Sequence, residues 1–121
     1  MTWKTVTQNG RTIAVITDSK PQLVDTASAT DLLMTAIYKY HADRLAFAKE
    51  AVSEEFFLLS SGLAGEVLQK FINYQAKFAV FGDFSNYTSK PLHDFIYESN
   101  QGKDVFFAPT EDEAVRRLAN A

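Results

Sequence analysis

The residues best suited to chemistry lie in two short polar segments of this sequence. The first, LSSGLAGE at residues 59–66, carries two hydroxyl groups, two glycines and a carboxylate. The second, GDFSNYTS at residues 82–89, carries a carboxylate, several hydroxyl groups and two aromatic rings. Hydroxyl groups at a helix start can be phosphorylated or can cap the helix, and two carboxylates can act as acid and base.

Ser60 and Ser61 leave two interpretations open. A phosphate on either serine would suit the positive end of a helix that begins near Gly62, and its charge could build or disrupt an interface. Alternatively, the serines only cap the helix, and Gly62 and Gly65 let it pack closely on a sheet. A short motif is weak evidence, which favours capping. Ser61 is the residue that we would test first for phosphate.

Asp83 follows a predicted buried strand, where it could orient a ligand or act as a base. It could equally bond nearby backbone N–H groups in a turn. Glu66 is the nearest candidate partner, and no third ligand is visible, so we expect no metal site. His41 and His93 have no serine or acidic partner at a recognisable spacing, so no catalytic triad is predicted.

The GLAG sequence at residues 62–65 does not fit a nucleotide-binding loop. It lacks the lysine of a phosphate-binding loop and the glycine spacing of a dinucleotide-binding turn, so we expect no cofactor. Its backbone N–H groups, with the hydroxyl groups of Ser60, Ser61 and Ser85 nearby, could still hold an anion. Phe84 and Tyr87 are predicted to be exposed aromatic residues that could anchor an interface.

Composition narrows the classes of protein to consider. The chain has 121 residues, 46% of them hydrophobic and 22% charged, which suits a single domain over residues 1–121. A net charge of −3 argues against binding nucleic acid. The absence of cysteine excludes disulfides and thiolate chemistry and is consistent with a reducing cytoplasm. We find no signal-peptide core and no apolar run of membrane-spanning length, so we expect a cytoplasmic protein that does not contact a membrane.

Periodicity and turn residues predict an alternation of strands and helices. Asn9-Gly10 between two β-prone runs predicts a hairpin of strands 3–8 and 11–17. The first helix is predicted at 29–41, capped by Ser28 with Asp31 as the acidic residue of a capping box. The remaining predictions are strands at 44–48, 77–81 and 104–108, a helical turn at 54–57, and helices at 62–75, 90–99 (capped by Ser89 and ended by a left-handed Gly102) and 111–119 (capped by Thr110).

This order predicts an α/β fold with a mixed, mostly parallel sheet. Strands joined through helices run parallel, and ligands or partners meet such sheets at the carboxyl ends of the strands. The segments 49–53, 82–89 and 109–111 should gather there, beside the helix that starts near residue 62. We therefore expect a binding rim at this edge, formed by Gly62, Glu66, Gly82, Asp83, Phe84, Ser85, Tyr87 and Ser89.

From about residue 44 onward, the element order and the motif Ser60-Ser61-Gly62-Leu63 resemble the STAS domain, the fold of bacterial anti-sigma-factor antagonists. In that family an aspartate precedes the two serines, and the second serine is phosphorylated. Here Leu59 stands at the aspartate position. The resemblance implies a STAS-like fold and places Ser61 at the phosphorylated position.

Longer stretches resemble an uncharacterised bacterial domain-of-unknown-function family. They include FFLLSSGLAGEVLQKFINY at 56–74, FGDFSNYTSKPLHDFIYESNQGKDVFF at 81–107 and EDEAVRRL at 111–118. The resemblance extends from Ile13 to Leu118 and implies no activity.

We therefore predict a non-enzymatic regulatory or protein-interaction module that binds another protein, or a second copy of itself, through residues 59–66 and 82–89. The first alternative is a small-molecule or anion sensor at the same rim, which needs a concave site of roughly a few hundred Å³ with convergent polar groups. The weakest alternative is a hydrolase, which needs Glu66 and Asp83 close together with a raised pKa.

Overall fold

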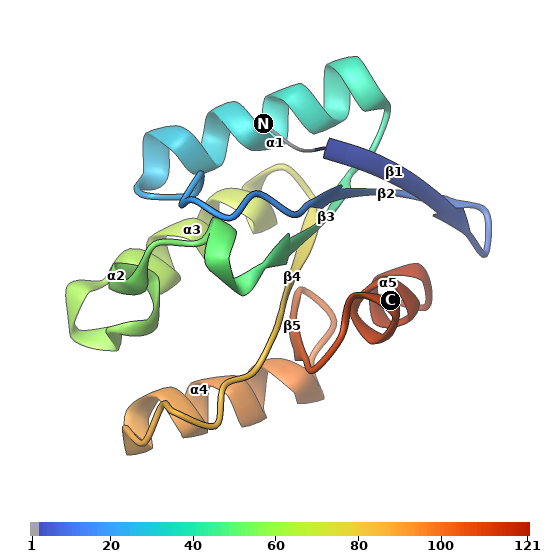
Figure 1. The fold of residues 1–121 in the computed structure, drawn as a ribbon. Helices are drawn as coiled ribbons and strands as arrows, with labels where there is room; N and C mark the ends of the chain where they lie inside the picture. The colour runs from blue at the N-terminus through green and yellow to red at the C-terminus, as the bar shows by residue number, and fades with distance from the viewer. Residues whose placement is uncertain (1–2) are drawn as a thin grey trace.

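The computed structural model describes residues 3–121, which form an α/β fold around one five-stranded sheet (Figure 1). The strands lie side by side in chain order, with the first pair antiparallel and the later pairs parallel. Their bounds are β1 (Trp3–Gln8), β2 (Arg11–Ile16), β3 (Arg44–Ala48), β4 (Lys77–Phe81) and β5 (Val105–Ala108). The mixed, mostly parallel sheet expected from the sequence is thus confirmed.

The helices form one layer on each face of the sheet (Figure 1). Three of them connect parallel neighbours and pack on the same face, as right-handed crossovers between successive strands require. The last helix crosses the opposite face. The bounds are α1 (Thr26–Tyr40), α3 (Leu63–Asn73) and α4 (Lys90–Gln101) on the first face, α5 (Glu111–Ala119) on the second, and the short α2 (Glu54–Phe57) after β3.

The N-terminal hairpin forms for the reason that the sequence suggests. Asn9 and Gly10 both have positive φ angles, 55° and 74°, as a tight turn between right-twisted strands needs. β2 lies between β1 and β3, so the run Ile13–Ile16 is buried on both faces of the sheet. The strand ends at Ile16, one residue before the predicted end.

Two predicted helix caps are wrong, and the ends predicted at residues 75 and 99 lie at Asn73 and Gln101 instead. α1 begins at Thr26, because Asp25 and not Ser28 is its cap; the Asp25 carboxylate accepts from the Ser28 N–H at 2.7 Å, and the Ser28 hydroxyl group accepts in return from the Asp25 N–H. Gly102 ends α4 with φ −95°, so no left-handed glycine is involved. The caps predicted at Ser89 and Thr110 are confirmed.

Arg44 is a buried charged residue at the start of β3, and it ties α5 to the sheet. Its Nε donates to the carbonyl oxygen of Leu118 at 2.8 Å, and its Nη1 donates to the carboxylate of Asp43 at 2.8 Å. Its Nη2 donates to the carbonyl oxygen of Ala121 at 3.2 Å. The guanidinium therefore adds charge-assisted hydrogen bonds to carbonyl groups at and just beyond the end of α5.

Replacing Arg44 by alanine should destabilise the protein by about 2–4 kcal/mol, because buried carbonyl groups lose charge-assisted hydrogen bonds. Urea unfolding followed by circular dichroism measures this loss. Arg116→Ala is the matched control, since Arg116 is exposed on α5 and its side chain pairs, among residues 3–121, with Glu113 of the same helix alone. Its effect should stay within about 0.5 kcal/mol. Equal effects of the two substitutions would contradict the role given to Arg44.

Candidate functional site

The segments that follow β3 and β4 pack tightly against each other at the carboxyl edge of the sheet. Gly82 has a φ of 152°, and a Cβ placed on it would lie 2.8 Å from the Cβ of Lys49. The Lys49 Nζ then donates to the carbonyl oxygen of Asp83 at 2.9 Å. Gly82 is therefore required both by its backbone conformation and by the space that Lys49 occupies.

Tyr87 joins the same two segments through its ring and its hydroxyl group. The ring stacks on Phe57 with centroids 5.0 Å apart, and the Lys49 ammonium lies 4.9 Å from the Tyr87 ring centroid. The hydroxyl group donates to both carboxylate oxygens of Glu54, at 2.8 and 3.0 Å. Burial and the hydrogen bond to Glu54 raise the pKa of Tyr87 above its ordinary value.

Phe84 is half-buried, so the prediction of an exposed aromatic anchor is wrong for it and for Tyr87. Its ring lies 5.9 Å from Phe57 and 5.7 Å from Phe107 between centroids. The ring of His93 contacts the carbonyl oxygen of Tyr87 from the first turns of α4. Aromatic contacts therefore hold the loop 82–89 in place, because Phe57 of α2 gives Phe84 and Tyr87 an apolar surface on which to pack.

Asp83 stabilises a turn, which is one of the two roles that the sequence allows for it. Its carboxylate accepts from the N–H of Ser85 at 2.9 Å, which closes the turn after β4. Hydrogen bonds from Ser85, with a smaller contribution from the charge of Lys49, lower the pKa of Asp83. A carboxylate with a lowered pKa stays ionised at neutral pH and is poorly suited to act as a general acid.

Ser61 and Ser60 differ in their surroundings. The Ser61 hydroxyl group donates to the carbonyl oxygen of Glu55 at 2.8 Å and accepts from the N–H of Leu63 at 3.2 Å. It therefore bridges the end of α2 and the start of α3. Ser60 is exposed, and the N-cap of α3 is Gly62, so neither serine is the predicted cap. Ser61 only accepts from the first N–H of the helix, that of Leu63.

The glycines of residues 62–65 do not serve close packing, which corrects the prediction. A Cβ on Gly62 or Gly65 would meet no atom within 4 Å. Gly62 is explained instead by its φ of 81°, since it caps α3 in the left-handed conformation. Gly65 is an exposed helical residue with no structural requirement for glycine.

Glu66 and Asp83 are not brought together. Glu66 lies in a hollow of about 360 Å³ between α3 and the start of α1, lined also by Thr26, Gln69, Lys70 and Asn73. Asp83 lines a different hollow, and its pKa is lowered where a hydrolase would need a raised one. The geometry therefore does not support an acid–base pair of these two carboxylates. Among residues 3–121, no three His, Asp or Glu side chains gather as a metal site would need.

A hollow of about 390 Å³ beside Gly82 matches the size expected of a sensor site, but its lining is mostly apolar. Its walls are formed by Gly82, Asp83, Phe84, Ile96, Phe107, Ala108 and Pro109. Its polar groups do not converge, because the Asp83 carboxylate and carbonyl group are already bonded to Ser85 and Lys49.

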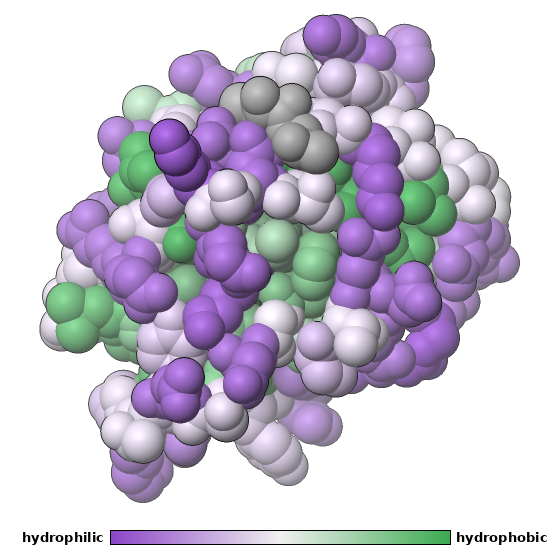
Figure 2. All heavy atoms as spheres, viewed as in Figure 1, coloured by the Kyte–Doolittle hydropathy of each residue, from purple (hydrophilic) through white to green (hydrophobic). Residues whose placement is uncertain are grey.

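Exposed apolar side chains remain near this rim. Leu58, between α2 and α3, is 61% exposed, and Val24, in the loop before α1, is 41% exposed. The loop before α1 is joined to the segment between β3 and α2, because Leu23 pairs with Val52 in an isolated parallel bridge. On the face shown in Figure 2, hydrophobic residues form separate patches between polar side chains, so the apolar surface on that face is local and not broad.

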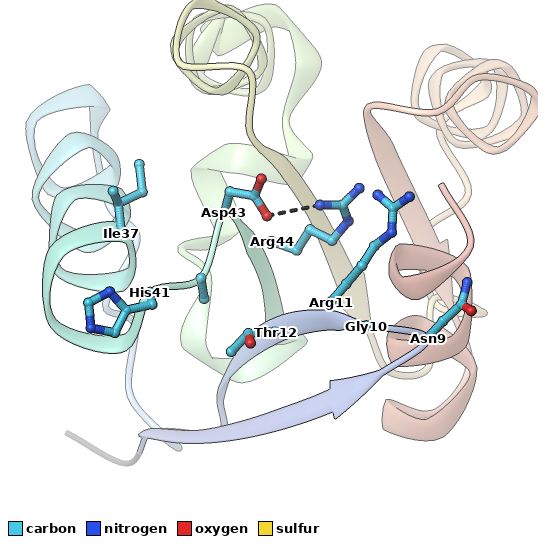
Figure 3. Close-up of a pocket in the computed structure, with 9 residues that line it drawn as sticks. Asn9, Gly10, Arg11, Thr12, Ile37, His41, Asp43 and Arg44 are labelled. Atoms are coloured by element: carbon cyan, nitrogen blue, oxygen red, sulfur yellow. Dashed lines mark hydrogen bonds and ion pairs between the residues drawn. The ribbon is translucent and has the colours of Figure 1, made fainter.

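A second concave region lies at the amino ends of the parallel strands, where sequence reasoning assigned no site (Figure 3). It has a volume of about 640 Å³ and is lined by the hairpin turn, the end of α1 and the start of β3. Arg11, Arg44 and His41 bring their side chains to it. The only signal in the sequence was an arginine at the first position of two adjacent strands.

Comparison with known proteins identifies the family. The family model described as "Domain of unknown function (DUF4180)" matches residues 8–118. The chain belongs to this family. The resemblance to an uncharacterised domain family is thereby confirmed, whereas no curated protein and no solved structure gives a match to the chain. Within the described part of this DUF4180 domain, none of the helices has the length and apolar character to cross a membrane.

Gly82→Ala should destabilise this domain by about 2–4 kcal/mol, because the new methyl group meets Lys49 and the φ angle disfavours a side chain. Gly65→Ala is the matched control. It should stabilise the protein by about 0.5–1 kcal/mol, since an exposed helical glycine costs conformational entropy without any compensating contact. Chemical denaturation of the unmodified protein and the two variants tests both the predicted loss and the predicted gain of stability. A Gly82→Ala variant of unchanged stability would contradict the close approach of Gly82 to Lys49.

Tyr87→Phe removes one hydroxyl group and keeps the ring stacked on Phe57. It should cost about 0.5–1.5 kcal/mol, the net contribution of a hydrogen bond to Glu54. Glu54→Gln should cost less, because a glutamine carbonyl oxygen can still accept from Tyr87. Tyr97→Phe is the control, since Tyr97 is 68% exposed. Thermal unfolding of the unmodified protein and the three variants gives the order of their stabilities. A loss of stability for Tyr97→Phe equal to that for Tyr87→Phe would contradict the role given to the Tyr87 hydroxyl group.

Proposed function

We propose that this DUF4180 domain is a regulatory module that binds a protein partner, or a second copy of itself, through the rim at the carboxyl edge of its sheet. The observation that carries this proposal is a rim loop tied to the segment after β3 by several contacts, while Leu58 stays 61% exposed beside it. Lys49, Phe57 and Tyr87 hold the loop, as described above. A surface fixed before binding loses less conformational entropy when a partner docks.

The chemistry of the rim indicates what a partner must present. Leu58 and Val24 offer exposed apolar contact, and the adjacent segment 49–55 carries three glutamates, two of which open α2. An apolar anchor flanked by basic side chains would complement this surface. The exposed backbone at Gly62 and Gly65 also lets a partner approach α3 closely, since no side chain stands there.

Ser61 offers a route to regulation of the same surface. Phosphorylation would replace the hydroxyl hydrogen that Ser61 donates to Glu55, so the link between α2 and α3 would be lost. Leu58 lies within that link. This role for Ser61 agrees with the STAS-like fold that we propose for the chain, supported by an N-terminal hairpin followed by alternating strands and helices in sequential order.

A small-molecule sensor at the same rim is the second candidate, and the 390 Å³ hollow beside Gly82 favours it. An apolar ligand would fit its walls. We place it second because the hollow offers few free polar groups to fix the orientation of a ligand. Sites for small molecules usually combine apolar walls with such polar groups.

Photo-crosslinking in cells tests the proposed interaction surface. A photoreactive amino acid is introduced singly at Leu58, Val24 and Gly65, with Asp112 as the control because it is exposed on α5, on the opposite face of the sheet. We expect a discrete crosslinked species from Leu58 and a neighbouring rim position, but none from Asp112. Its mass distinguishes a second copy of the chain from a different protein.

Two results would contradict the proposal. One is crosslinking that is equal at Asp112 and at the rim positions, which would indicate random encounters. The other is the absence of any discrete species from the rim positions while the substituted proteins remain folded, as judged by circular dichroism. Gly82→Ala gives an internal check, because a displaced rim loop should reduce crosslinking at Leu58.

A further inference from the structure

The hollow at the amino ends of the parallel strands lies at the end of the sheet opposite the rim, so its function is independent of the one proposed above. It has a volume of about 640 Å³, which falls in the usual range for small-molecule sites. Three separate parts of the chain form it: the hairpin turn at residues 9–12, the end of α1 and residues 42–44 (Figure 3).

Two guanidinium groups occupy the same side of this hollow. Arg11 and Arg44 extend from adjacent strands, both line the hollow, and their side chains point the same way in Figure 3. Arg44 cannot turn away, because Leu118, Asp43 and Ala121 hold it. Arg11 is exposed, and its guanidinium forms no hydrogen bond or ion pair with any residue in the described range 3–121.

The charges around the pair are not balanced. The Asp43 carboxylate is bonded to the buried Arg44, which leaves the charge of Arg11 without a partner in the hollow. An anion bound to Arg11 and Arg44 would neutralise this unpaired positive charge. Guanidinium groups are also the side chains best matched to the oxygen atoms of phosphate and carboxylate groups.

Other residues that line the hollow could contact the rest of a ligand whose anionic group is bound by the arginines. The Thr12 hydroxyl group and the His41 ring both line the hollow, and neither side chain has a hydrogen-bond partner among the described residues. Ile37 supplies an apolar wall from α1. The site therefore combines charged donors for an oxyanion with an apolar surface for a carbon body.

We propose that this hollow binds a small organic anion, with its phosphate or carboxylate group held by Arg11 and Arg44 and its apolar part against Ile37. Arg11 is the residue that contributes most of the binding and least of the fold. Arg44 serves both, because it also holds the end of α5.

The test is a titration of ¹⁵N-labelled protein at constant ionic strength, followed by amide chemical shifts. The probes are inorganic phosphate, phenyl phosphate and benzoate. We expect saturable shifts at residues 9–12 and 41–44, with phenyl phosphate binding more tightly than inorganic phosphate because it also reaches Ile37.

Arg11→Gln should weaken binding by about tenfold or more, as the loss of charge-assisted hydrogen bonds implies. Arg11→Lys, which keeps the charge but loses the paired donors, should give an intermediate affinity.

Arg116→Gln is the matched control, because it removes the same charge from a different hollow lined by Lys103, Arg116 and Arg117. Its affinity for each probe should change by less than about twofold. A preference for benzoate over phenyl phosphate would assign the head group as carboxylate, and the reverse would assign it as phosphate; both support the site. Equal losses in Arg11→Gln and Arg116→Gln, shifts centred on residues 116–117, or no shift with any probe up to roughly 20 mM, a limit set by the weakest useful affinities, would overturn it.

Discussion

At the carboxyl edge of the sheet, the backbone of Gly82 lies so close to the Lys49 side chain that no other residue fits there without a shift. This contact brings the Lys49 ammonium over Tyr87 and onto the carbonyl oxygen of Asp83. Tyr87 then reaches Glu54 and Phe57 on α2. The conformation of the whole rim therefore depends on one close approach between the residues that follow two neighbouring strands.

The two ends of the sheet are built from different interactions, and this difference separates their proposed functions. At the carboxyl edge, aromatic stacking and hydrogen bonds engage Asp83 and Tyr87, and Leu58 stays exposed for contact with a protein. At the amino end, Arg44 is fixed by the carbonyl group of Leu118 in α5, and Arg11 lines the same hollow with no partner in the described range 3–121. A free cationic donor in a concave site favours a small anion over a flat protein surface.

Local sequence signals were sufficient for most of the fold and for little of the site. Asn9-Gly10 and the buried run Ile13–Ile16 predicted the hairpin and the inner strand, because turn chemistry and burial act over a few residues. The start of α1 was misplaced because Asp25 and Ser28 are both good caps, and only their mutual hydrogen bonds decide between them.

Tyr87 was expected to be exposed because its partners Glu54 and Phe57 lie about thirty residues away, a separation at which pattern reasoning carries no information. The presence of Arg11 and Arg44 in one hollow depends on the alignment of β2 with β3, in which Ile13 and not Arg11 is the partner of Arg44.

The central claim is that the rim is rigid before any partner binds, and ¹⁵N relaxation of the free protein tests it most directly. We predict backbone order parameters of about 0.85 for residues 54–62 and 82–89, equal to those of β3 and β4. Gly82→Ala should lower them in the loop 82–89 while leaving the strands unchanged. Order parameters below about 0.6 across residues 84–88 of the unmodified protein would contradict the account, because a loop that mobile could not be held by Lys49, Phe57 and Tyr87.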